Sequence, residues 1–271
     1  MTLALRRHLD EAGFQDVRIH MSDDGWLAGS AKRAEEFRKS PEVWKAIDYA
    51  ASHMYDDQNY FRNPDNYDAV MIKFKEATKD KPFLSTELCV NDARYQADSY
   101  RLAFLMGQVY QKNLVLTDAV AVCYCWTLLN VVQPSYGWTR TLFIVDEASG
   151  LMPAPFSNQL RVFGAYSRRI KEGMVRIDAN CKDKNLLVCA FEGDGGAATF
   201  VALNRDTSPA TVRVVWPGAD FKYMETTDQF NPNTITPVPV TDSDGVLQLL
   251  VPPAAIVTLT NVPLGTISNN L

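Results

Sequence analysis

The chain has 271 residues, of which 46% are hydrophobic and 22% are charged, so it has enough apolar material for a large core in one or two domains. Its net charge of −5 argues against nucleic acid as a partner, because no basic stripe is available to neutralise phosphates. No apolar run reaches the roughly 20 residues that cross a bilayer, so we expect no membrane span.

From its start to about residue 170, the chain alternates between short apolar runs and amphipathic stretches. Residues 1–13 predict a helix that ends at Gly13. The runs then predict strands over 16–21, 46–53, 82–87 and 119–126, and the stretches between them predict helices over 28–40, 64–78 and 95–111. This order indicates βαβ units and a parallel sheet, which amount to half of a (β/α)₈ TIM barrel.

The pattern changes after residue 173. Apolar and polar residues now alternate, and glycine, proline and aspartate separate strands predicted over 186–191, 198–204, 211–216, 246–251 and 255–259. The second part therefore favours an antiparallel β-sandwich. We expect an α/β fold class with a partial barrel over residues 1–172 and a C-terminal β-sandwich over residues 173–271, joined without a flexible linker.

Residues 81–87, Lys-Pro-Phe-Leu-Ser-Thr-Glu, form a short apolar strand that ends on a carboxylate. A buried strand that brings Glu87 to the rim of a barrel is how a retaining glycosidase presents its nucleophile. The same position also suits an ordinary glutamate in the first turn of a helix. His53 and Tyr55 end a neighbouring strand and face one side, so they could donate hydrogen bonds to Glu87, although His53 equally suits a core position.

The cysteines and histidines show no metal-binding spacing. Cys123 and Cys125 are too close in sequence for a zinc knuckle, and the odd total of five cysteines favours buried thiols, with room for one disulfide. Asp23 and Asp24 follow a predicted strand, but a lone pair lacks the further oxygen ligands of a hard cation. We therefore expect no metal and no other cofactor.

The order of these segments resembles the C-terminal part of glycoside hydrolase family 30, whose members are retaining β-glycosidases with a (β/α)₈ barrel fused to a β-sandwich. The segments that carry the resemblance are His-x-Tyr at 53–55, Phe-Leu-Ser-Thr-Glu at 83–87, Cys-Tyr-Cys-Trp at 123–126 and Tyr-Ser-Arg-x-Ile-x-x-Gly at 166–173. The resemblance spans nearly the whole chain. It implies that Glu87 is the catalytic nucleophile and that the partner is a β-linked oligosaccharide or polysaccharide.

The resemblance also implies where a sugar would bind. Trp126 ends the predicted eighth strand, where an indole could stack on a pyranose ring or simply pack in the core. The aromatic loop 130–140 follows it, and such loops carry specificity unless they only pack locally. The predicted substrate contacts are His53, Tyr55, Trp126, Tyr136, Trp138 and Arg140, with Asp23, Asp24 and Trp26 as weaker candidates.

One departure from the family pattern affects the function. Families of this clan place the general acid/base after strand four, usually within an Asn-Glu dipeptide, and this sequence has neither that dipeptide nor counterparts of strands one to four. We therefore expect a fragment without its acid/base, with exposed sheet edges that favour self-association. The expected function is cleavage of β-glycosidic bonds with retention, and the alternative is a non-catalytic carbohydrate-binding fragment. The substrate class suggests a secreted or periplasmic protein.

Overall fold

A computed structural model describes residues 1–21, 23–56, 63–89, 100–125, 127–130, 142–146, 150–153, 158–239 and 246–264. The chain forms two compact units, and each is described by itself. Unit 1 comprises Met1–Arg94 and Lys112–Met152, and unit 2 comprises Tyr95–Gln111 and Pro153–Leu271. The division after residue 172 that the sequence suggests stays a prediction.

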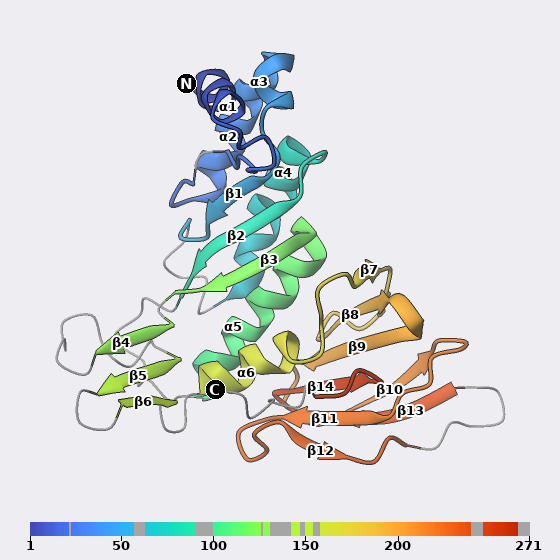
Figure 1. The fold of residues 1–271 in the computed structure, drawn as a ribbon. Coiled ribbons are helices and arrows are strands. Elements are labelled where there is room, and N and C mark those ends of the chain that lie inside the picture. The colour runs from blue at the N-terminus through green and yellow to red at the C-terminus, as the bar shows by residue number, and fades with distance from the viewer. Residues whose placement is uncertain are drawn as a thin grey trace. The chain divides into compact units, whose positions relative to one another are not determined.

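Unit 1 is built on parallel strands, as predicted. Its described part contains a three-stranded sheet in the order β1 (Ala50–His53), β2 (Phe83–Leu88) and β3 (Ala119–Tyr124) (Figure 1). A second sheet pairs β4 (Leu128–Asn130), β5 (Phe143–Asp146) and β6 (Gly150–Pro153). The first sheet supplies the strand ends that carry the predicted site.

The strand predicted over 16–21 is not a regular strand. The backbone there runs parallel to β1 only through isolated bridges, at His20 and at Asp24. A regular backbone ladder does not form there because the Ile19 N–H donates to the Asp48 carboxylate, at 2.8 Å, in place of a backbone carbonyl. The segment still covers the outer edge of β1, since Met21 donates its N–H to the Tyr49 carbonyl at 2.9 Å.

Helices pack on this sheet as the alternating pattern predicts. The helical segments of unit 1 are α1 (Thr2–Glu11), α2 (Leu27–Arg38), α3 (Pro41–Lys45), a 3₁₀ turn (Pro64–Tyr67), α4 (Asp68–Thr78) and a π-helical turn (Asn113–Thr117). Phe74 of α4 contacts Phe83 of β2 with ring centroids 4.6 Å apart. Ser30 of α2 hydrogen-bonds Ser52 of β1 at 3.0 Å. Parallel strands backed by helices are the architecture of part of a (β/α)₈ barrel.

Strand β3 leaves an open sheet edge within the described residues, because its hydrogen-bonded neighbour there is β2. The Val120 side chain on this strand is 61% exposed. An open, apolar edge is a template for pairing with another chain. We therefore expect the 271-residue polypeptide to self-associate, and we expect Val120→Lys to shift it toward the monomer, because a lysine on an edge opposes pairing.

Size-exclusion chromatography with light scattering tests this expectation. Ile72→Lys is the matched control, since Ile72 is 47% exposed but lies on helix α4 and has no free strand edge beside it. A polypeptide that is already monomeric at micromolar concentration, or equal effects of the two substitutions, would count against pairing through β3.

Unit 2 is the antiparallel β-sandwich that the sequence predicts. Its six-stranded sheet has the order β12 (Thr234–Thr236), β11 (Tyr223–Thr227), β14 (Ala255–Thr260), β9 (Ala197–Asn204), β8 (Leu186–Gly193) and β7 (Val175–Ile177), as far as the structure describes the chain. It faces a pair formed by β10 (Ala210–Val215) and β13 (Val246–Val251). Phe200, Val212, Leu249 and Leu259 belong to the core between these sheets.

Two helices, α5 (Tyr100–Lys112) and α6 (Asn158–Ser167), contact the large sheet (Figure 1). Tyr100 donates its hydroxyl to the Thr227 and Ala254 carbonyls at 3.0 and 2.9 Å. Gly107 allows the close approach of α5, because a Cβ there would lie 2.8 Å from Val162. Strand β14 is therefore buried along its whole length, as expected for a central strand covered on both faces.

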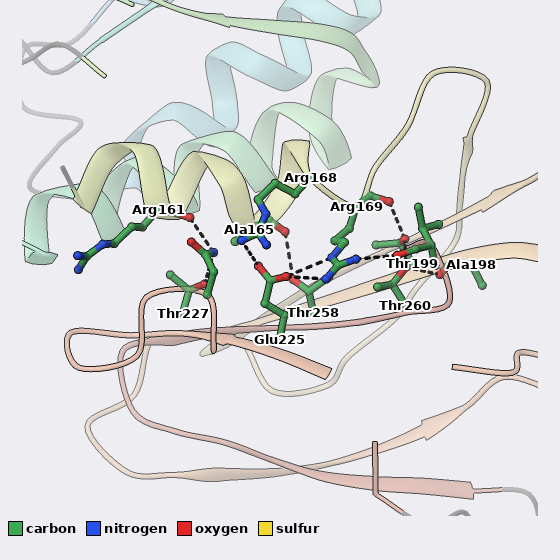
Figure 2. A network of polar contacts seen from close by, with 12 residues as sticks. Arg161, Ala165, Arg168, Arg169, Ala198, Thr199, Glu225, Thr227, Thr258 and Thr260 are labelled. Atoms are coloured by element: carbon green, nitrogen blue, oxygen red, sulfur yellow. Dashed lines mark hydrogen bonds and ion pairs between the residues drawn. The ribbon is translucent and has the colours of Figure 1, made fainter. Parts of the chain in front are cut away.

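A buried ion-pair network joins the end of α6 to the sheet (Figure 2). Arg169 and Glu225 have fully buried side chains and meet at 3.0 Å, and Arg168 reaches the other Glu225 oxygen at 3.1 Å. Thr199 and Thr258 donate their hydroxyls to the backbone carbonyls of Arg169 and Ala165. The large sheet thus holds the helix end through several hydrogen bonds and ion pairs.

We expect Arg169→Met to lower the free energy of unfolding of unit 2 by about 3–5 kcal/mol, because Glu225 would keep a buried charge without its main partner. Arg168→Met is the matched control and should cost much less, since the Arg168 side chain is 32% exposed. Urea unfolding followed by circular dichroism measures both. Equal losses from the two substitutions would contradict the central role of Arg169.

Candidate active site

A register shift in β2 positions Glu87. Ala50, Ala51 and Ser52 pair with Phe83, Leu84 and Ser85, but His53 then pairs with Glu87. Thr86 is therefore an extra residue on β2. Such irregularities re-aim side chains beside functional sites. As a result, the carboxylate lies next to His53 at the end of the strand.

Two side chains from the end of β1 contact the Glu87 carboxylate. The Tyr55 hydroxyl donates to Glu87 Oε1 at 2.8 Å, and His53 Nε2 lies 3.5 Å from Oε2. The two rings meet edge to face, with centroids 5.8 Å apart. Burial, together with Cys89 and Glu87, raises the pKa of Tyr55 far above its ordinary value, so the hydroxyl stays protonated and remains a donor. The Glu87 side chain is 34% exposed and can therefore meet a ligand.

Asp23 is the second carboxylate of this cluster. Its Oδ2 lies 3.6 Å from the same His53 Nε2, and its Oδ1 accepts a hydrogen bond from the Thr86 hydroxyl. Both carboxylate oxygens of Asp23 therefore have protein partners, and one of these partners is Thr86, the extra residue of β2. Asp23 is placed to orient His53 and to hold β2 in its shifted register.

Two thiols complete the surroundings of Glu87. Cys89 Sγ lies 3.3 Å from the Tyr55 hydroxyl, and Cys125 interacts electrostatically with both Glu87 and Cys89. Burial, with Glu87 and Cys89 beside it, raises the pKa of Cys125 to about 12. Cys125 is therefore a neutral thiol around pH 7 and can act as a weak donor.

Two further carboxylates near the site, those of the candidate Asp24 and of Asp56, have structural roles. Asp24 accepts a hydrogen bond from Arg33 at 3.0 Å and packs so closely on α2 that a Cβ at Gly29 would lie 2.7 Å from its carboxylate. Asp56 accepts the backbone N–H groups of Leu27 and Ala28, at 2.7 and 2.8 Å, at the start of the same helix. Burial raises the pKa of Asp56, although these two bonds oppose the shift.

Several predicted substrate contacts cannot be placed. Trp126, Tyr136, Trp138 and Arg140 lie outside the described residues. Trp26 is described and is 56% exposed next to the start of α2. Among the residues that the structure describes, no group of three or more His, Cys, Asp or Glu side chains could hold a metal ion.

The arrangement brings together Glu87, His53 and Tyr55 from the predicted set. It shows His53 and Tyr55 at the carboxylate, and their contact with a sugar stays a prediction. Cys89 and Cys125 were not predicted for the site, although each directly follows a strand of the same sheet in the structure. A partly exposed carboxylate fixed by a hydroxyl and an imidazole can act as a nucleophile toward an electrophilic carbon.

Comparison with known proteins supports the resemblance to glycoside hydrolase family 30. Residues 173–259 match the family model described as the glycosyl hydrolase family 30 beta sandwich domain. A search of the curated proteins finds no match. None of the described helices is long and apolar enough to cross a membrane.

Solved structures share the fold along nearly the whole chain. The family 30 subfamily 8 xylanase Xyn30A from Clostridium acetobutylicum is 15% identical, with a TM-score of 0.67 over 96% of this chain and 60% of its own. The catalytic domain of xylanase C from Talaromyces cellulolyticus is 15% identical, with a TM-score of 0.73 over 96% and 55%. A conserved exported protein from Bacteroides fragilis is 14% identical, with a TM-score of 0.74 over 96% and 58%. The chain thus spans 55–60% of the length of these structures, and the likeness confirms the predicted partial barrel with a β-sandwich.

Proposed function

We propose that the chain is the C-terminal part of a retaining β-glycosidase. Glu87 would attack the anomeric carbon of a β-linked oligosaccharide or polysaccharide and form a glycosyl-enzyme ester. A longer polypeptide, here called the completed barrel, would add the first four βα units and the general acid/base. The observation that carries the proposal is the Glu87 carboxylate at the end of β2, which accepts a hydrogen bond from the Tyr55 hydroxyl at 2.8 Å and has His53 Nε2 3.5 Å from its other oxygen.

The geometry supports a division of labour among the residues of the site. The Tyr55 hydroxyl donates to one oxygen of Glu87 and the His53 ring lies beside the other, so together they limit rotation of the carboxylate. A fixed carboxylate meets the anomeric carbon in one orientation, and this lowers the entropic cost of attack. Asp23 already binds His53 and Thr86, so we assign it to positioning and place the acid/base elsewhere.

The stereochemistry of the product tests the reaction class. Double displacement through Glu87 would release the β-anomer first, because each of the two steps inverts the anomeric carbon. Proton NMR of the completed barrel acting on a β-linked xylan or glucan oligosaccharide follows this directly in the first minutes. Initial release of the α-anomer would show that a water attacks instead.

Removing the Tyr55 hydroxyl should weaken the nucleophile without removing it. We expect Tyr55→Phe to lower kcat/KM of the completed barrel by about 10–100-fold, since a hydrogen bond to a charged group contributes roughly 1.5–3 kcal/mol. Tyr49→Phe is the control, since Tyr49 precedes β1 and its pairing with the neighbouring segment uses only the backbone. Steady-state kinetics on an aryl β-glycoside measures both, and a Tyr55→Phe enzyme with unchanged kcat/KM would remove Tyr55 from the mechanism.

The second candidate function is carbohydrate binding without cleavage. It is favoured by one feature of the sequence, the absence of an Asn-Glu dipeptide that could supply the acid/base. The coding DNA ahead of Met1 separates the two candidates. An in-frame segment that encodes four βα units and an Asn-Glu would support the glycosidase, whereas its absence would favour the binding fragment.

A further inference from the structure

Cys89 and Cys125 lie side by side at the ends of adjacent strands. Leu88 of β2 is in register with Tyr124 of β3, and the Cys125 N–H donates to the Leu88 carbonyl at 3.2 Å. Cys89 directly follows Leu88, and Cys125 directly follows Tyr124. The two thiols also lie close enough for Cys89 to raise the pKa of Cys125.

This placement suits a disulfide. Adjacent strands run about 4.8 Å apart, and disulfides bridge Cα atoms that lie about 4.4–6.8 Å apart, so the strands would need little movement. All five cysteines are thiols in the structure. Cys89 is buried, whereas Cys125 is only partly buried and can be reached from solvent.

We propose that Cys89 and Cys125 form a reversible disulfide in exchange with a small-molecule disulfide such as glutathione disulfide, and that this bond changes the hydrogen bonding of Glu87. Cys125 is deprotonated and attacks one glutathione sulfur, forming a mixed disulfide and releasing the first glutathione. Cys89 then loses its proton and attacks Cys125, forming the new S–S bond and releasing the second glutathione. Two electrons and two protons pass from the pair to the two glutathiones.

The consequence for the site follows from the lost hydrogens. In the disulfide neither sulfur carries a proton, so neither can donate a hydrogen bond. The Cys89 sulfur that contacts the Tyr55 hydroxyl at 3.3 Å also becomes bonded to Cys125. The bond therefore disturbs the contact that supports Tyr55, which is the hydrogen-bond donor to Glu87. Because burial raises the pKa of Cys125 to about 12, attack is slow near neutral pH and the pair persists as thiols until the oxidant is concentrated.

Peptide mapping of the 271-residue polypeptide tests whether the bond forms. Cys123→Ser and Cys181→Ser are introduced first, because both thiols are exposed and Cys123 shares a tryptic peptide, residues 113–140, with Cys125. After incubation with glutathione disulfide and blocking of the remaining thiols, the expected product joins this peptide to residues 80–94 and is two hydrogen atoms lighter than their sum. Buried Cys189 should stay a thiol and serves as the internal control.

Two further variants in the same background complete the test. Cys89→Ser should stop the reaction at a glutathione adduct on Cys125, and Cys125→Ser should leave Cys89 as a thiol. Lack of the linked peptide despite glutathione on Cys125 would overturn the proposal, and so would a cross-link of Cys89 in the Cys125→Ser variant.

The effect on Glu87 rests on the proposed function and is measured separately, in the completed barrel. Cross-linking should lower turnover about ten-fold or more, as expected when a charged group loses a hydrogen bond, and dithiothreitol should restore it. Turnover of Cys125→Ser should not respond to glutathione disulfide. A cross-link with unchanged turnover would overturn the coupling to Glu87, whereas an enzyme without turnover before oxidation would refute the proposed function and leave the peptide result standing.

Discussion

Glu87→Gln is expected to lower kcat/KM of the completed barrel by several powers of ten. The amide keeps the size of the side chain and can still accept a hydrogen bond from Tyr55, but it has no negative charge with which to attack the anomeric carbon. The loss should therefore appear in the first chemical step, with KM little changed. Stopped-flow and steady-state assays on a 2,4-dinitrophenyl β-glycoside measure this step.

Two comparisons make that experiment specific. Glu76→Gln is the matched control, because Glu76 is an exposed glutamate on α4, and its rate should stay within about two-fold, as for most surface substitutions. Glu87→Gly should be rescued by azide, which fits the space left by the carboxylate and attacks the same carbon. A Glu87→Gln enzyme with near-normal turnover would contradict the assignment.

The isolated 271-residue polypeptide should hydrolyse natural β-glycosides negligibly. Natural leaving groups need a proton, and general acid catalysis typically contributes about 10²–10⁴-fold. We propose that this proton comes from a residue outside the chain, because the sequence has no Asn-Glu dipeptide and Asp23 is tied to His53 and Thr86. Aryl glycosides with good leaving groups need little protonation, so a small residual burst on them is consistent with Glu87 acting alone.

Assays of natural and aryl β-glycosides with the isolated polypeptide and with the completed barrel test this prediction. The completed barrel should cleave natural and activated glycosides, and the isolated polypeptide should at most release aryl groups slowly. A monodisperse 271-residue monomer with robust turnover on both substrate types would contradict the proposed fragment.

The sequence predicted the elements whose patterns are local. Apolar runs and helical spacing placed β1, β2, β3, α2 and α4 within a few residues, and strand alternation predicted the sandwich. The segment 16–21 was predicted as a strand but is not one, because the Asp48 side chain replaces a backbone partner. Hydrophobic periodicity cannot reveal a hydrogen bond of this kind between a side chain and the backbone.

The grouping of the candidate site residues was predictable where they follow neighbouring strands, and unpredictable where the register between two strands decides which side chains meet. Glu87, His53 and Tyr55 lie at the C-terminal ends of two neighbouring parallel strands, so the order of the strands is enough to bring them together. The extra residue Thr86 shifts β2, and its bond to Asp23 depends on that shift. The thiol pair was missed for the same reason, since only the register of β2 and β3 sets Cys89 beside Cys125.

Covalent trapping of Glu87 tests the central claim most directly. A 2-deoxy-2-fluoro-β-glycoside with a good leaving group slows hydrolysis of the glycosyl-enzyme, so the sugar stays on the nucleophile long enough for peptide mapping. In the completed barrel, the proposed mechanism predicts one added fluorosugar on the tryptic peptide of residues 80–94, attached to Glu87. A fluorosugar on any other residue, with Asp23 as the nearest rival, would contradict it.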